Sequence, residues 1–319
     1  MIMKRFLVIC GMFFGSIFLL TGCFDDDGAY DDSSNASEEE SPSEGTLSVV
    51  ATFSIIADMV EQVGGELVNV YTIVPIGEDP HEHEVLPGDM VVVSDADVIL
   101  YNGMNLETGN GWFDALLEAT DREAVVVSEG VTPIYLTTEG LEDYQDPHAW
   151  IDIRNGVVYI ENITRILSGL APEYTDIFEA NAQAYIANLE ALHDEWSGVF
   201  SEIPDSERLL VTAEGAFRYF GYTYGVEVNH IWEINAHEEG TPEQMMRIVG
   251  IINESNVRVL FTESSVEVLY MEQVSEETGV PIFDMLFTDS LSESSGPAAT
   301  YYDFMRHNLE TVFNGLTGE

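Results

Sequence analysis

The sequence has almost no lysine and almost no cysteine. Lys4 is the only lysine among 319 residues, so Schiff-base chemistry and Ser-x-x-Lys catalysis are excluded from the folded part of the chain. The only cysteines are Cys10 and Cys23, both close to the N-terminus. Beyond them, disulfides, thiolate metal sites and cysteine nucleophiles are excluded. The HExxH, GxSxG, P-loop and GxGxxG motifs are absent as well.

Basic residues as a class are scarce. Lysine and arginine together number 10, against 58 aspartates and glutamates, and the formal net charge is −48. A field of this sign repels nucleic acids and anionic lipids, so we expect no nucleic-acid partner. It suits a saline or alkaline habitat, where salt screens the repulsion between carboxylates. Because carboxylates are so common, a single Asp or Glu is weak evidence for a ligand.

The N-terminus has the pattern of an export signal. Lys4 and Arg5 precede an apolar run of fifteen residues, 6–20, which is followed by the letters LTGC. A membrane-spanning helix needs about 20 apolar residues, whereas a signal peptide needs fewer. The LTGC ending resembles the lipobox of bacterial lipoproteins. We therefore predict a lipoprotein signal peptide at 1–22, lipid on Cys23 and an extracytoplasmic domain anchored to the cell membrane. An uncleaved anchor is the alternative.

Residues 23–45 are predicted to form an acidic, disordered linker, because nine acids lie between 24 and 45 with no basic residue and little to bury. From residue 46 onward, short β-rich runs alternate with helical patterns. This alternation predicts an α/β protein with mainly parallel sheets. We divide it into an N-terminal lobe, 46–171, and a C-terminal lobe, 204–319.

A single long helix is predicted to join the two lobes over residues 172–203. Its apolar residues Tyr185, Leu189, Leu192 and Trp196 recur at steps of four and three, which is the pattern of one buried helical face. From Pro172 to about residue 200 this helix would be roughly 40 Å long, at 1.5 Å per residue.

Four side chains with metal-binding atoms lie at the ends of strand-like or apolar runs. His81 and Asp289 follow strand-like runs, Glu214 ends one, and His148 begins an apolar run. Ligands of α/β proteins collect at the carboxyl ends of strands, so these four can close one site with two residues from each lobe. Each also has an ordinary structural interpretation, as a loop histidine, a hydrogen-bonded histidine or a helix-capping acid. The Asp-Pro-His triplet favours the metal site, because it occurs at two of only seven histidines.

A series of motifs resembles the solute-binding lipoproteins of ABC importers for manganese, iron and zinc, some of which were named surface adhesins. The resemblance runs from about residue 46 to the C-terminus. It rests on GEDPHEHEVLP, DADVILYNGMNLETG, DPHAWIDIRNG, TAEGAFRYF, IWEINAHEEGTPEQM, VLFTESSVE and LFTDSL.

The resemblance implies two α/β lobes bridged by a long helix, metal ligands at the four positions named above, and a partner ABC permease. We expect a monomer with no catalytic residues. Glutamate at 214 is similar to the manganese and iron branch, since zinc-type members usually have histidine there. His83 and His237 depart from the family pattern, and either can offer a secondary contact. A secreted metallohydrolase and an adhesin with an incidental metal are the alternative functions.

The expected ion is Mn²⁺, with Fe²⁺ or Zn²⁺ as alternatives. Two imidazoles and two carboxylates form a hard site that suits Mn²⁺ or Fe²⁺, although the general affinity order places Zn²⁺ above both. Imidazole must be neutral to bind a metal, so affinity is expected to fall below about pH 6.5.

Overall fold

The computed structural model describes residues 46–235 and 239–318. The predicted signal peptide, Cys23, the linker and His237 lie outside the described residues. In the part that is described, no helix is both long enough and apolar enough to cross a membrane.

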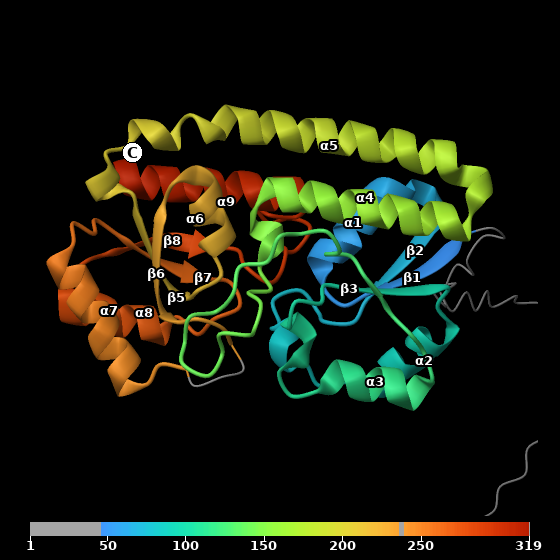
Figure 1. The fold of residues 1–319 in the computed structure, drawn as a ribbon, viewed down its shortest axis with the longest axis horizontal. Coiled ribbons are helices and arrows are strands. Elements are labelled where there is room, and N and C mark those ends of the chain that lie inside the picture. The colour runs from blue at the N-terminus through green and yellow to red at the C-terminus, as the bar shows by residue number, and fades with distance from the viewer. Residues whose placement is uncertain (1–45, 236–238, 319) are drawn as a thin grey trace, which may run out of the picture. The chain divides into compact units, whose positions relative to one another are not determined.

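The N-terminal lobe is built on one parallel sheet of four strands in the order β2-β1-β3-β4 (Figure 1). The central strand β1 pairs Val49 with Val70 on one side and with Val98 on the other. Its last three residues are fully buried, because helices cover the sheet. The strands are β1 (Leu47–Ala51), β2 (Val68–Thr72), β3 (Val98–Tyr101) and β4 (Val125–Val126).

Helices lie on both faces of this sheet (Figure 1). The helix α1 follows β1 after two residues and packs against α4 and the long helix α5. The helices of the lobe are α1 (Ser54–Gly64), α2 (Pro87–Asp95), α3 (Trp112–Thr120) and α4 (Ile153–Leu170).

The C-terminal lobe contains two parallel two-stranded sheets, β5-β6 and β7-β8. A buried side chain connects them: the Glu263 carboxylate on β7 accepts the backbone N–H groups of Ala213 (2.7 Å) and Glu214 (3.0 Å) on β5. This carboxylate takes the place of ladder hydrogen bonds between β5 and β7. The strands are β5 (Leu209–Glu214), β6 (Glu227–Trp232), β7 (Leu260–Glu263) and β8 (Ile282–Leu286).

The helices of this lobe are α6 (Arg218–Tyr224), α7 (Pro242–Glu254), α8 (Leu269–Thr278) and α9 (Tyr301–Thr317). Helix α7 starts with the capping box that Thr241 and Gln244 form, each side chain accepting the other residue's backbone N–H. The proline at its first position also favours a helix start.

Helix α5 (Thr175–Ser197) runs along both lobes (Figure 1). It contacts α1 and α4 in the N-terminal lobe and α6 and α9 in the C-terminal lobe. The predicted fold class, two α/β lobes with parallel sheets and one long connecting helix, is confirmed. The lobes are also linked beside α5, where the buried Asp58 carboxylate on α1 accepts the Tyr301 backbone N–H (2.9 Å) and the Tyr185 hydroxyl (3.1 Å). Three helices, α1, α5 and α9, therefore meet at one carboxylate.

Candidate metal site

Each candidate histidine ends a turn of the same kind. In each Asp-Pro-His triplet the aspartate side chain accepts the backbone N–H of the histidine: Asp79 from His81 (2.7 Å) and Asp146 from His148 (3.0 Å). Such an Asx turn fixes the backbone of the histidine two residues after the aspartate. His81 then lies in the 3-10 turn η2 (Pro80–Glu82), and His148 directly precedes η4 (Ala149–Ile151).

The two candidate carboxylates come from the C-terminal lobe. Glu214 is the last residue of β5, and Asp289 lies three residues beyond the end of β8. Both are buried, as are His81 and His148, with no more than 1% of each residue exposed. The four residues thus come from loops and strand ends of both lobes.

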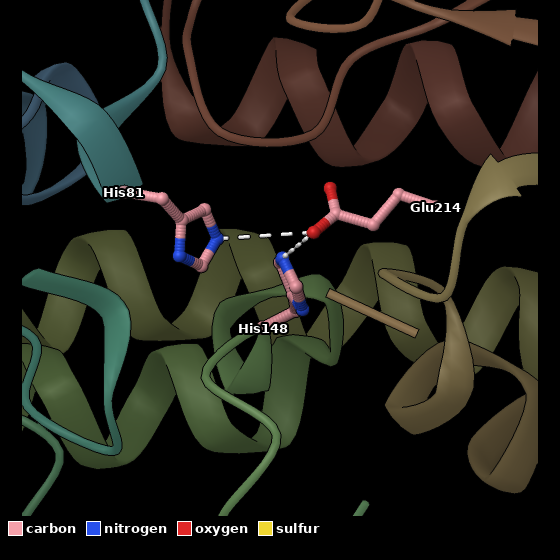
Figure 2. Close-up of side chains that lie close together, drawn as sticks. All are labelled: His81, His148 and Glu214. Atoms are coloured by element: carbon pink, nitrogen blue, oxygen red, sulfur yellow. Dashed lines mark ion pairs between the residues drawn. The ribbon is translucent and has the colours of Figure 1, made fainter. Parts of the chain in front are cut away.

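Their donor atoms converge on one point. Figure 2 shows both imidazole Nε2 atoms facing the same oxygen of Glu214, His81 at 3.8 Å and His148 at 3.6 Å from Oε1. His148 Nε2 also lies 3.4 Å from Asp289 Oδ1. Two ligands about 2.1 Å from one ion, at a near-tetrahedral angle, are about 3.4 Å apart. The observed separations fit an ion placed between these atoms.

Neighbouring groups fix the orientation of the candidate ligands. Asp146 Oδ1 contacts His148 Nδ1 at 2.8 Å, so Nδ1 carries hydrogen and Nε2 faces the other three candidates. Ser265 donates to Asp289 Oδ2 at 2.7 Å, and the backbone N–H of Asn235 donates to Glu214 Oε1 at 2.7 Å. For His148 and Asp289 the partner contacts the atom that points away from the site, whereas Asn235 contacts the same Glu214 oxygen that the two imidazoles face.

Other ligand atoms of these residues lack such partners. Among the described residues, no hydrogen bond is made by His148 Nε2, Glu214 Oε2 or Asp289 Oδ1, although all are buried. A buried polar group without a partner costs about 1–3 kcal/mol, and more when it is charged. A bound cation would satisfy His148 Nε2 and Asp289 Oδ1 directly, and Glu214 Oε2 as well when this carboxylate binds through both oxygens.

Electrostatics favours a cation as well. Burial raises the pKa of Glu214 well above its usual range, and the nearby Asp289 and Asp79 charges add to this, against the opposing effect of His148. Burial alone would lower the pKa of His148, but Glu214, Asp146 and Asp289 together raise it well above 6.5. Burial alone would raise the pKa of Asp289, but His148, His81 and Ser265 together lower it below its usual value. The metal-free site therefore holds protons that a cation would displace.

A cavity of about 280 Å³ lies beside His81. Its other lining residues are uncharged: Asn105, Thr108, Gly109, Tyr144, Ile234 and Asn235. Asn105 belongs to a run of three residues with positive φ, Gly103 (72°), Met104 (52°) and Asn105 (70°). The buried Glu107 carboxylate secures the start of this run by accepting the backbone N–H groups of Asn102 (2.8 Å) and Gly103 (3.1 Å). Polar loops thus form a chamber large enough for a hydrated ion.

The structure brings the four predicted residues together, but it separates His83 from them. His83 faces Glu78 and Asp89 instead. Sequence reasoning missed Asp79 and Asp146 as parts of the site. The duplicated Asp-Pro-His triplet carried the signal, because its aspartate shapes the turn in both copies.

The comparisons with known proteins agree with this geometry. Residues 49–315 match the family described as ZnuA, zinc-uptake complex component A, periplasmic. The chain belongs to this family. It is a metal-binding protein of an ABC importer, and therefore not an enzyme, which rules out the metallohydrolase alternative. It works outside the cytoplasm, as its lipoprotein and periplasmic relatives do.

Individual relatives differ in the metal they are named for. The chain is 44% identical over 275 residues to the manganese ABC transporter substrate-binding lipoprotein PsaA of Streptococcus mitis, covering 85% of this chain and 89% of that protein. It is 40% identical over 318 residues to the iron lipoprotein MtsA of Streptococcus pyogenes serotype M1, covering 98% and 99%. The Mn-bound periplasmic metal-binding protein of candidatus Liberibacter asiaticus superposes with a TM-score of 0.76 at 29% identity, covering 85% and 100%.

Proposed function

We propose that this protein captures Mn²⁺ between its lobes, with His81, His148, Glu214 and Asp289 as the ligands, and delivers it to a membrane permease. The observation that carries the proposal is the convergence of buried ligand atoms from His81, His148 and Glu214 within 4.8 Å of one another, with Asp289 Oδ1 lying 3.4 Å from His148 Nε2. The ion is the transported substrate, and no covalent step is involved.

Three properties support Mn²⁺ as the ion. The donor set has two nitrogens and two carboxylates, either of which can bind through both oxygens, and this suits a hard ion. The relative PsaA is named for manganese, and the neighbour from candidatus Liberibacter asiaticus was solved with Mn bound. Zn²⁺ binds such donors more strongly in general, and MtsA is named for iron, so selection depends on geometry and metal supply.

Capture requires only a small adjustment of the lobes. A hydrated ion enters the chamber beside His81, exchanges water for the ligands and neutralises buried carboxylates. Because α5 contacts helices of both lobes and Asp58 joins α1, α5 and α9, large hinge motions are opposed. Release on the permease then needs only local displacement of the ligand loops.

Anchoring is proposed to use the N-terminal residues. After removal of 1–22, Cys23 is the first mature residue and carries the lipid, and the linker 23–45 separates the domain from the membrane. The domain consists of the N-terminal lobe 46–171, the connecting helix 172–203 and the C-terminal lobe 204–319. Several acyl chains on one cysteine give stable attachment. A Cys23→Ser variant should appear in the culture medium or periplasm and take up no labelled palmitate. Membrane retention of that variant would contradict lipidation.

The metal assignment is tested by elemental analysis of the protein purified from its native host, followed by competitive titration with Mn²⁺, Fe²⁺ and Zn²⁺. We expect one tightly bound ion per chain. The variants His81→Ala and Asp289→Ala should lose it while keeping the circular dichroism spectrum of the parent protein. A metal-free protein that binds none of the three ions would refute the proposal.

Glu214→His tests the choice of metal. Replacing a carboxylate with a third imidazole softens the site, so the preference for Zn²⁺ over Mn²⁺ should increase. Glu227→His is the matched control, because it adds a histidine at an exposed position at the start of β6. Equal preferences in the parent protein and Glu214→His would argue against position 214 as a determinant of metal choice.

A further inference from the structure

His83 is buried without a hydrogen-bonding role. Its side chain is 3% exposed, and neither ring nitrogen has a hydrogen-bond partner among the described residues. The ring is nevertheless fixed in place. It meets the edge of Trp112 at a centroid distance of 5.2 Å, and its backbone carbonyl accepts from the Asn110 side chain at 3.3 Å. The contacts that hold this imidazole in place therefore use neither ring nitrogen.

Each nitrogen instead faces a carboxylate at the spacing of two metal ligands. Nδ1 lies 3.7 Å from Glu78 Oε2, and Nε2 lies 3.6 Å from Asp89 Oδ2. Both distances are too long for hydrogen bonds, whose N···O separations are about 2.7–3.2 Å. They are close to the roughly 3.4 Å between two ligands at a tetrahedral angle around one ion.

The two carboxylates have different environments. Asp89 is buried and already accepts the Tyr71 hydroxyl (2.7 Å) and the Leu86 backbone N–H (2.7 Å). The Glu78 side chain is 59% exposed, so an ion beside it can keep water ligands. The order Asp89, His83, ion, Glu78 is that of the main site, where Asp146 lies behind His148 and Glu214 in front, although Asp146 contacts its imidazole at 2.8 Å and Asp89 lies 3.6 Å from His83 Nε2.

We propose that His83 Nδ1 and Glu78 Oε2 form a second, weaker binding site for a divalent transition metal, completed by water and with Asp89 as the outer partner of the imidazole. Only two protein atoms bind the ion directly, so it exchanges quickly. Glu78 follows Gly77, whose backbone N–H donates to Ser290 Oγ (2.8 Å), next to Asp289. The second site therefore lies on the same loop as His81, and this loop also contacts Ser290, the neighbour of Asp289. It can concentrate ions near the main site before capture.

The test uses the full chain, freed of metal, and Zn²⁺ alone as the probe. In high salt, which screens diffuse binding to the acidic surface, titration should give one tight and one weaker equivalent. In Glu78→Gln the weaker equivalent should bind at least about tenfold less tightly, with the tight one unchanged. Nitrogen-15 NMR of the histidine rings should show Nδ1 of His83 shifting only with the second equivalent.

Matched controls separate this site from general acidity. Glu82→Gln and Glu84→Gln remove the same charge from exposed neighbours of His83 and should leave both equivalents unchanged. His83→Gln should abolish the weaker equivalent, and the exposed Glu78 provides an independent test if that variant folds poorly. The proposal is wrong if there is no second equivalent, if it survives in Glu78→Gln, or if the two controls weaken it equally.

Discussion

At the scale of single residues, the most informative feature is the aspartate of each Asp-Pro-His triplet. Asp79 and Asp146 set the turn that presents a histidine, and Asp146 also holds the imidazole of His148 by its Nδ1. Outer partners of this kind fix which nitrogen faces a metal and raise its basicity. Asp146, two residues earlier in the chain, thus determines which ring nitrogen of His148 faces the metal.

Asp146→Asn should weaken metal binding about 10- to 100-fold, because the amide can still accept the backbone N–H but no longer supports the imidazole as a carboxylate does. Isothermal titration with Mn²⁺ measures the change. Asp143→Asn, an exposed substitution in the same loop, should leave the affinity unchanged. Equal affinities for all three proteins would mean that Asp146 serves only the turn.

Metal affinity should rise with pH, and over a higher range than a free histidine would give. The pKa of His148 lies well above 6.5 because of Glu214, Asp146 and Asp289, despite burial. A proton must therefore leave before the ion binds, so affinity increases as pH approaches that raised pKa and falls at lower pH. Titrations in buffers of different ionisation enthalpy will count the protons released. An affinity that stops rising by about pH 7.5, as for an imidazole near its ordinary pKa of about 6.5, would contradict this prediction.

At the scale of elements, the turn η4, just before α4, connects the site to the rest of the molecule. Trp150, just before α4, packs beside His148 with ring centroids 5.4 Å apart and donates to the Thr288 carbonyl at 2.9 Å. Tyr301, at the start of α9, donates to the Trp150 carbonyl at 2.6 Å. The position of His148 therefore depends on helices from both lobes.

Gly156→Ala in α4 should destabilise the protein by about 1–3 kcal/mol, because its new methyl group would overlap the Tyr301 hydroxyl. The matched substitution Gly169→Ala, near the end of the same helix and in open space, should be neutral or stabilise by up to about 1 kcal/mol. Urea unfolding followed by circular dichroism measures both. Similar free energies of unfolding for the two variants would show that α4 adjusts freely against α9.

At the scale of the whole molecule, charge is the dominant property. The net charge of −48 is distributed over a chain with only eight arginines after residue 5. Repulsion among exposed carboxylates opposes the compact state, and mobile ions reduce it.

The melting temperature of the metal-free protein should therefore rise as NaCl is added from low to molar concentration. Most of the gain should come where the Debye length falls from about 30 Å to about 8 Å. Sucrose, which stabilises by exclusion and carries no charge, is the control, and its effect should not depend on the salt already present. A melting temperature independent of NaCl would show that charge repulsion is not limiting.

Much of this architecture can be predicted from apolar runs and their ends. The strands of the described residues lie within β-rich runs that the sequence predicts, since buried parallel strands are short and continuous in apolar residues. These runs are 46–54, 68–75, 97–103, 124–130, 208–215, 227–234, 257–264 and 281–287. Helix α4 was not predicted, because its many β-branched residues have low helix propensity and packing against α1 and α5 decides its form. The burial of His83 and its separation from the four candidate ligands depend on loop packing that has no sequence period.

The contact between Asp58 and the start of α9 has a consequence for biosynthesis. Asp58 lies on α1, whereas Tyr301 belongs to α9, and the Ser54 hydroxyl likewise accepts the backbone N–H of Leu291. The N-terminal lobe cannot complete its hydrogen bonds until the final segment of the chain has been made. The contacts of Asp58 and Ser54 with Tyr301 and Leu291 therefore belong to the last stage of folding, after these residues have been synthesised.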